Sequence, residues 1–170
     1  MARKAPAQKP GTSEQVVGTP LDFIRAVHRE FGSLSWDLAA LSTNQKASGW
    51  YLGPDAISEK YRDSLTVDWS TLEPYAEGRC YWLNPPFANI TPWAKKCAHH
   101  ASVDGVQVLM LVPASIGANW YDEWVTPFAD VYSVGRMVFE GSTQPYPKDL
   151  ILAHYWKLGG HKLKRWRWEK

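Results

Sequence analysis

Apolar residues recur at helical spacing near the start of the chain. Ile24, Val27 and Phe31 fall on one face of a helix, and Gly32 ends the pattern. Thr19-Pro20 precedes them and resembles an N-cap followed by a proline in the first helical turn. The sequence therefore predicts a first helix of about a dozen residues that begins at this pair and ends at the glycine.

Short apolar runs with strand character alternate with helical patterns along the rest of the chain. The clearest run covers 106–112, which is unbroken, is closed by Pro113 and is typical of a buried strand. Further strands are predicted at 34–39, 65–69, 80–83, 131–134 and 150–155, further helices at 92–100 and 120–128, and a loop with a short helix at 41–62. This alternation predicts an α/β fold with a mainly parallel sheet and helices on both faces.

The length of 170 residues fits a single domain. Residues 1–14 contain Lys4, Lys9 and small polar residues without periodicity, so we expect a flexible basic arm before one domain at 15–170. The net charge of +2 does not by itself indicate nucleic-acid binding, so local patches must carry such a function. No apolar run approaches the roughly 18 residues of a membrane span, and the protein is expected to be soluble.

The chain has two cysteines and 10 tryptophans. With no second pair for a zinc site, Cys80 and Cys97 are predicted to be buried thiols in a reducing compartment. His99-His100 lacks partner ligands at metal spacing, so we interpret it as part of a surface helix and predict no metal. The tryptophans are expected mainly in packing, although base stacking also requires such side chains.

The motif Asn84-Pro85-Pro86-Phe87 directly follows the predicted strand at 80–83. Two prolines supply no backbone N–H and hold φ near −65°, and Asn84 is pushed toward extended geometry because it precedes a proline. The Asn84 side-chain oxygen and the Pro85 carbonyl can therefore accept hydrogen bonds from one donor group, while Phe87 offers a flat apolar face beside them. This arrangement suits a planar amine such as the exocyclic nitrogen of adenine.

A turn after a strand is the simpler interpretation of this motif, because Asn and Pro are common in turns. Its position favours a site, however. Asp37, Asp68 and Asn84 all fall at predicted strand ends, and ligands of such sheets bind outside the carboxyl ends of the strands. We therefore expect one edge of the sheet to collect all three side chains. Capping of a helix or loop is the alternative role for each aspartate.

An ordered series of motifs covers roughly residues 17–155. Its segments are Thr19-Pro20, Asp37-Leu38-Ala39-Ala40 with Asn44 and Lys46, Asp63-Ser64-Leu65 with Asp68-Trp69, Trp82 to Phe87, Leu111-Val112-Pro113-Ala114 with Trp120, and Gly135-Arg136 with Phe139. Together they resemble the phage-type, Dam-like N6-adenine DNA methyltransferases. The resemblance implies a Rossmann-like, S-adenosylmethionine-dependent methyltransferase fold, and transfer of a methyl group to adenine N6 in DNA. It also implies a cytoplasmic enzyme of a bacterial host, if the protein is phage-encoded.

The resemblance also implies roles for individual residues. Asn84 to Phe87 match the catalytic motif of amino-methyltransferases. Thr19 and Pro20 are similar to the helix start that borders the methionine end of S-adenosylmethionine, and Asp68 matches a group near the cofactor adenine. Asp37 either lies near the methionine amine or accepts hydrogen bonds from the ribose hydroxyls.

The predicted cofactor site departs from a common pattern at one point. Many methyltransferases carry a Gly-x-Gly loop, whereas here the segment Asp37-Leu38-Ala39-Ala40 takes that place. Ala39 is small enough for close approach of a ligand but does not adopt positive φ as readily as glycine. The cofactor site is thus predicted from the resemblance more than from a motif of its own.

DNA contacts are predicted from basic residues outside the sheet edge. The segment 162–168 interleaves cations with aromatic residues, which suits phosphate contact by Lys164, Arg165 and Arg167 and base stacking by the aromatic residues. An edge strand with one solvated, charged face explains the pattern equally well. Arg136 either binds phosphate or supports the fold. Short insertions after residue 40 and around 114–124 are the candidate DNA-facing loops.

Other functions stay open on the sequence alone. The Asn-Pro-Pro-aromatic corner also suits methylation of RNA adenine, of cytosine N4 or of a protein glutamine amide, because each presents a planar amino group. A non-catalytic DNA-binding module is the second alternative, in which the basic termini act and the corner is only a turn. For the DNA enzyme, the hypothesis includes flipping of the target adenine into a pocket at a cost of roughly a few kcal/mol.

Overall fold

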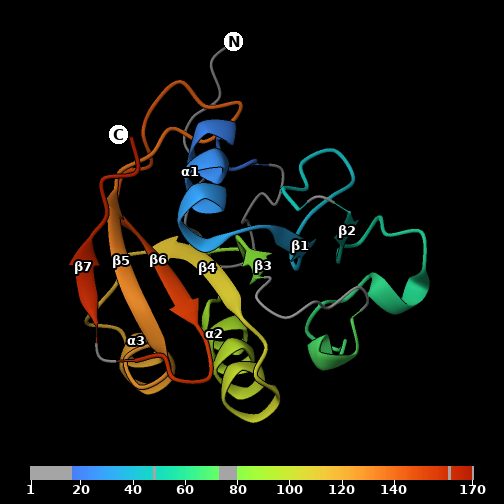
Figure 1. Ribbon diagram of the computed structural model, residues 1–170. Helices are drawn as coiled ribbons and strands as arrows, with labels where there is room; N and C mark the ends of the chain where they lie inside the picture. Colours follow the sequence, from blue (N-terminus) through green and yellow to red (C-terminus); the bar gives the residue numbers. More distant parts are fainter. Residues whose placement is uncertain (1–16, 48, 73–79, 161, 170) are drawn as a thin grey trace.

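The computed structural model describes residues 17–47, 49–72, 80–160 and 162–169, so the basic arm predicted at 1–14 lies outside the described residues. Within them, one seven-stranded sheet has the order β2-β1-β3-β4-β6-β5-β7 (Figure 1). The strands are β1 (Leu34–Asp37), β2 (Trp50–Tyr51), β3 (Cys80–Leu83), β4 (Val108–Pro113), β5 (Ala129–Gly135), β6 (Leu150–Tyr155) and β7 (Leu163–Arg165). The helices are α1 (Leu21–Phe31), α2 (Thr91–His99) and α3 (Asn119–Trp124), with 3-10 turns η1 (Glu59–Tyr61) and η2 (Trp69–Thr71) and a π-helical turn η3 (His100–Asp104).

The sheet is mainly parallel, as the sequence predicts. β1 pairs in parallel with β2 and β3, β3 with β4, and β5 with β7. Only β6 runs against its neighbours β4 and β5. The carboxyl ends of β1, β3, β4, β5 and β7 therefore lie at one edge of the sheet, where ligands of such sheets bind.

Side chains of the central strands alternate between two cores. Trp82 and Leu109 pack with Phe23 of α1 on one face, whereas Tyr81 and Met110 belong to the core that contains the buried side of α2. This alternation follows from the strand period of two, and burial of each large side chain stabilises the fold by roughly 1.5–3 kcal/mol. The prediction of helices on both faces is confirmed, with α1 on one face and α2 and α3 on the other.

The carboxyl-terminal segment forms the edge strand β7. Trp166 and Trp168 pack beside Phe23, with ring centroids at 5.6 and 5.0 Å, and the indole of Trp168 donates a hydrogen bond to the Val134 carbonyl. The strand interpretation of this segment is therefore confirmed, and its two tryptophans contribute to packing. Cys80 and Cys97 are free and buried, as predicted, and burial raises the pKa of Cys80 to about 11.

The strand predicted at 65–69 is wrong. Polar side chains there bond to nearby backbone: Asp63 accepts from the Leu65 N–H and Asp68 from the Ser70 N–H, each at 3.0 Å, and Asp68 caps η2. Such local hydrogen bonds replace those of a strand ladder. The sequence also missed β2, and the helix predicted at 120–128 ends earlier because Pro127 cannot continue it.

Within the described residues, no helix combines the length and the apolar composition that a bilayer crossing demands.

Candidate active site

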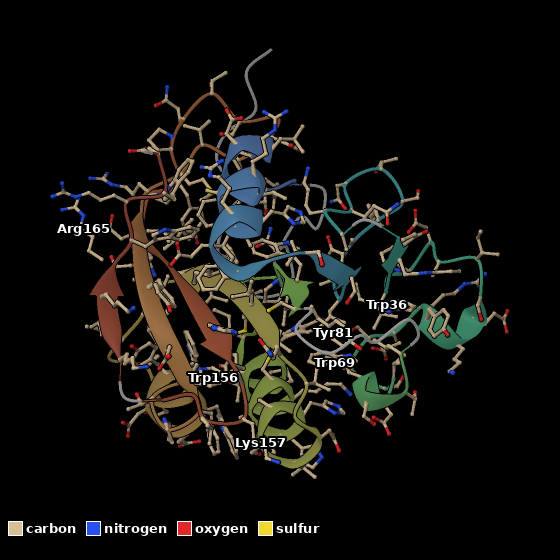
Figure 2. The ribbon with its side chains drawn as sticks, viewed as in Figure 1. Trp36, Trp69, Tyr81, Trp156, Lys157 and Arg165 are labelled. Carbon is tan, nitrogen blue, oxygen red and sulfur yellow. The ribbon has the colours of Figure 1, made fainter. Side chains whose placement is uncertain are left out.

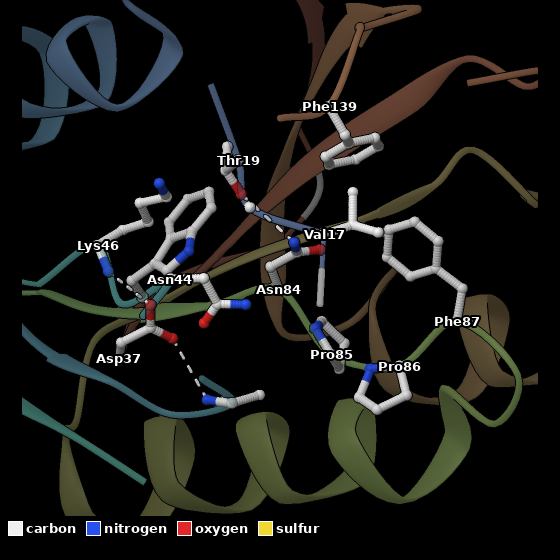
Figure 3. A pocket seen from close by; sticks show the side chains of 13 residues that line it. Val17, Thr19, Asp37, Asn44, Lys46, Asn84, Pro85, Pro86, Phe87 and Phe139 are labelled. Atoms are coloured by element: carbon white, nitrogen blue, oxygen red, sulfur yellow. Dashed lines mark hydrogen bonds between the residues drawn. The ribbon is translucent and has the colours of Figure 1, made fainter. Parts of the chain in front are cut away.

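A pocket opens at the carboxyl edge of the sheet, beside the end of β3 (Figure 3). Asn84 and the following prolines form one wall, Asp37 and Ala39 come from the end of β1, and Thr19 comes from the segment before α1. The site therefore collects two of the three strand-end polar residues that the sequence placed there. The lining residues are Val17, Gly18, Thr19, Asp37, Ala39, Asn44, Lys46, Trp82, Asn84, Pro85, Pro86, Phe87 and Phe139.

The Asn84 side chain has a defined orientation. Its Nδ2 donates a hydrogen bond to Thr19 Oγ1 over 3.3 Å, and Thr19 is only 1% exposed. The amide oxygen consequently points away from Thr19 and toward Val17 in the pocket (Figure 3). The amide oxygen is thus the end of the Asn84 side chain that is presented to the pocket as a hydrogen-bond acceptor.

The N-cap role predicted for Thr19 is wrong. The cap position of α1 is occupied by Pro20, without a side-chain cap, and the Pro20 carbonyl accepts a hydrogen bond from the Ile24 N–H at 3.1 Å. Because Pro20 lacks an N–H and has extended geometry, it starts the helix one residue later than expected. Thr19 is thereby released to contact Asn84, whereas Pro20 does not line the pocket.

Phe87 belongs to an aromatic cluster at the other side of the pocket. Its ring lies 6.2 Å from that of Phe139 and 5.4 Å from that of Tyr146, both in edge-to-face contact. Phe139 and Tyr146 are buried, whereas Phe87 is only partly buried. The cluster holds Phe87 in place with part of its surface toward solvent, as a stacking surface for a planar ligand requires.

Asp37 contributes a buried carboxyl group to the pocket. It is 2% exposed and accepts hydrogen bonds from the N–H groups of Lys46, at 2.8 Å, and Ala39, at 3.3 Å. Burial raises the pKa of Asp37 to about 7, although these hydrogen bonds and the Lys46 charge act in the opposite direction. Asp37 can therefore exchange a proton near neutral pH and, when ionised, attract a cationic group of a ligand.

Lys46 and Glu140 form an ion pair that the sequence did not predict. Lys46 Nζ donates to both carboxylate oxygens of Glu140, at 2.8 and 2.7 Å, and the Lys46 side chain is only 7% exposed. The pair joins the segment before β2 to the loop between β5 and β6. Its partners are 94 positions apart, so no local pattern could reveal it.

Comparison with known proteins bears on this site directly. The sequence model of the DNA N-6-adenine-methyltransferase (Dam) family matches residues 8–149, a span that contains every pocket residue. The chain belongs to this family. The family predicted from the motifs is thus confirmed.

A curated relative points the same way. The DNA N-6-adenine-methyltransferase of Haemophilus phage HP1 (strain HP1c1) is 26% identical over 86 residues, which are 51% of this chain and 42% of the relative. The chain thus matches less than half the length of that Dam family relative. No solved structure matches the chain significantly.

Asp68 lies away from the pocket of this Dam family protein. It caps η2 beside η3, which follows α2 and leads back to the start of β4, so it is not at the carboxyl edge of the sheet. The expectation that Asp68 joins Asp37 and Asn84 at one edge is therefore wrong. The cause is the missing strand at 65–69, since Asp68 follows no strand end.

His100 is buried, so the surface-helix interpretation is wrong for this residue. It stacks on Trp69, and its Nδ1 lies 2.7 Å from Asp104 Oδ2 and 3.9 Å from Asp68 Oδ1. One ligand atom from each of the three lies within 4.8 Å of the others, which is a donor set that a metal ion can use. Of these three residues, His100 and Asp104 already contact each other directly through the 2.7 Å approach of Nδ1 and Oδ2.

The basic residues predicted to contact DNA are exposed. Lys164 and Arg165 are in β7, Arg167 follows them, and Arg165 points outward from the molecule (Figure 2). Arg136 follows β5 at the same edge of the sheet as the pocket and lies 3.8 Å from Asp149. Because β7 runs parallel to β5 with Arg165 opposite Ser133, Arg167 and Arg136 extend beyond neighbouring strand ends.

Proposed function

We propose that the protein transfers a methyl group from S-adenosylmethionine to the N6 amino group of adenine in DNA. Family membership supports the reaction, and the orientation of Asn84 is the structural observation that carries it. Its amide oxygen and the Pro85 carbonyl accept hydrogen bonds from the N6 hydrogens. These bonds concentrate the nitrogen lone pair toward the methyl group and hold it in line for attack.

The residues of the pocket fit the methyl donor. The ionised Asp37 carboxylate attracts the ammonium group at the methionine end, and Ala39 is small enough to let that end approach the end of β1. S-adenosylmethionine supplies an electrophilic methyl group on a sulfonium sulfur. The N6 lone pair forms the new bond to the methyl carbon while the carbon–sulfur bond breaks, which leaves a neutral thioether, and N6 then loses one proton to solvent.

The target adenine must leave the duplex for this reaction, because its N6 is engaged in base pairing. Flipping costs roughly a few kcal/mol, part of which stacking on Phe87 offsets. The DNA-facing surface consists of Arg136, Arg165 and Arg167 together with the turn after β4. Ala118 N–H bonds to the Ser115 carbonyl at 3.0 Å in that turn, which carries the exposed Ile116 at its tip.

Nucleoside analysis tests this function. The protein is incubated with labelled S-adenosylmethionine and adenine-unmethylated DNA, and N6-methyladenine is the expected product. Asn84→Ala should lower the rate by at least about 100-fold, as loss of a pre-organised polar group does in other active sites. Asn89→Ala is the matched control, because Asn89 is exposed and does not line the pocket.

The same experiment separates the alternatives. If the label appears in N4-methylcytosine, in RNA or in protein, the substrate is another planar amine and not adenine in DNA. Binding of DNA without any transfer would instead indicate a non-catalytic module. Full activity of Asn84→Ala would refute the mechanism even if N6-methyladenine forms.

A further inference from the structure

The Lys46–Glu140 pair differs from the exposed ion pairs of the described residues. In the pairs Arg25–Asp22 and Arg62–Glu59, each side chain is at least 49% exposed. The Lys46 side chain is 7% exposed, and its ammonium binds both oxygens of one carboxylate. A charge removed from water to this extent interacts strongly with its partner, and loss of that partner is costly.

Each partner of the pair also holds a second element of the pocket. The Lys46 N–H donates to Asp37 Oδ2 at 2.8 Å, and the Glu140 N–H donates to the Gly18 carbonyl at 2.9 Å. A side chain at position 18 would overlap the Glu140 carboxylate, so a larger residue there would displace the Glu140 side chain from its present position. Gly18 precedes Thr19, whose hydroxyl binds the Asn84 amide.

These contacts form one continuous connection around the pocket. It starts at Asp37, passes through Lys46 and Glu140 to the segment of Gly18, and ends at Asn84. The two ends are the carboxylate assigned to the methyl donor and the amide assigned to the target amine. The ion pair links the two loops of this connection through side chains, while β1 and β3, which carry its two ends, are also paired directly in the sheet.

We propose that Lys46 and Glu140 are a positioning pair, which sets the affinity for the methyl donor by holding Asp37 and the Gly18 segment at a fixed separation. This inference rests on the proposed function. The charge of Lys46 is committed to Glu140, so Lys46 acts through Asp37 and does not bind the donor carboxylate itself. Small displacements of positioned groups change rates and affinities strongly, by up to about 100-fold for 1 Å.

Calorimetry with S-adenosylmethionine tests the pair in the full-length protein. Lys46→Met and Glu140→Gln are each expected to weaken donor binding by about 5- to 30-fold, the effect of one or two kcal/mol. The double variant should be no weaker than the worse single variant, because both changes remove one interaction. Lys46→Arg keeps the charge and can pair with both Glu140 oxygens, so it should weaken donor binding less than Lys46→Met.

Kinetics separates positioning from general support of the fold. The KM for S-adenosylmethionine should rise in both single variants while the KM for DNA stays unchanged. Glu59→Gln is the matched control, since it removes a carboxylate from an exposed ion pair outside the pocket and should leave both constants unchanged. If Lys46→Met fails to fold, Glu140→Gln still tests the positioning role. This variant should fold, because the Glu140 side chain is 40% exposed and the replacement is nearly isosteric.

Several results would contradict the positioning role of Lys46 and Glu140. Tighter donor binding by Glu140→Gln would show that Glu140 competes with the donor for Lys46. Additive losses in the double variant, or unchanged binding in every variant, would show that the pair does not act as a unit on the donor. Absence of donor binding by the wild type would refute the proposed function, whereas normal binding by wild type and variants alike would refute only the positioning role.

Discussion

Thr19 Oγ1 accepts a hydrogen bond from Asn84 Nδ2 over 3.3 Å, although the two residues are 65 positions apart. In this arrangement the amide nitrogen of Asn84 faces Thr19 and the amide oxygen faces the pocket. Since an amide oxygen accepts and an amide nitrogen donates, the opposite orientation would present hydrogens to the hydrogens of an incoming amine. A residue before α1 thereby contacts the amide of the motif after β3 on the side opposite to its acceptor oxygen.

Replacement of this hydroxyl should affect the chemical step. Thr19→Val keeps the shape of the side chain but removes the acceptor, and a net loss of about 1 kcal/mol corresponds to roughly a fivefold lower kcat. The KM for DNA should not change. Thr19→Ser retains the hydroxyl and is the control. Equal kcat values for the valine and serine variants would show that Asn84 is oriented by other contacts.

Local patterns in the sequence were sufficient for the framework that holds this site. The predicted strands at 80–83 and 150–155 coincide with β3 and β6, because an apolar run between polar segments depends only on neighbouring residues. The motif after β3 and Asp37 after β1 then lie at one edge through parallel pairing. The general location of the pocket was thus predictable.

Details that depend on distant residues were not predictable. Lys46 and Glu140 meet across 94 positions, and Thr19 and Asn84 across 65. Asp68 was misplaced because its side chain bonds to the Ser70 N–H and replaces the strand that the apolar pattern suggested. Burial of His100 likewise depends on Trp69, which stacks on it from η2.

Donor binding should depend on pH through Asp37. Burial raises the pKa of Asp37 to about 7, so its carboxylate becomes fully ionised only above neutral pH, and affinity for the cationic donor should increase from about pH 6 to about pH 8. Asp37→Asn should bind more weakly and with little pH dependence. Calorimetry at several pH values measures both. A pH-dependent affinity that persists in Asp37→Asn would assign the titration to another group.

The same group affects stability with a defined sign. Because the pKa of Asp37 in the folded protein lies above its ordinary value of 3.8, the folded state binds the proton more tightly than the unfolded state. The contribution of Asp37 to the free energy of unfolding is therefore complete below about pH 4 and is lost as the pH rises through about 7. Denaturant unfolding at several pH values in this range measures that contribution as the difference in the free energy of unfolding between the wild type and Asp37→Asn.

Ile116 should assist flipping of the target base. It is 60% exposed at the tip of a turn next to the active-site edge, a position where polar residues and glycine are usual. Apolar side chains that enter a base stack stabilise distorted DNA, so Ile116→Ala should lower kcat/KM on paired duplex by about tenfold. The loss should be smaller when the target adenine is mismatched, because flipping then costs less.

Ile57 supplies the matched control for this prediction. It is 99% exposed, lies between β2 and η1, and does not line the pocket, so Ile57→Ala should methylate both duplexes like the wild type. Fluorescence of a 2-aminopurine at the target position measures flipping directly. Equal losses for Ile116→Ala on matched and mismatched DNA would show that the side chain contributes to binding and not to flipping.

Arg165 and Arg167 should contribute phosphate contacts. Both are exposed at the edge of the sheet where the pocket opens, and no ion pair joins either to a carboxylate of the described residues. Each lost phosphate contact reduces the slope of log affinity against log salt concentration by about 0.9, so the double change to glutamine should reduce it by about 2. Binding should weaken on all sequences alike.

Lys157→Gln is the control for the change of Arg165 and Arg167 to glutamine. This cation lies at the far end of the molecule from Arg165 (Figure 2), so Lys157→Gln removes one positive charge without removing a predicted contact. A general effect of net charge would lower the salt slope in this variant too, whereas a localised interface predicts no change. Trp166 and Trp168 stay in place in both variants, so packing against α1 is preserved and any loss of binding comes from the arginines.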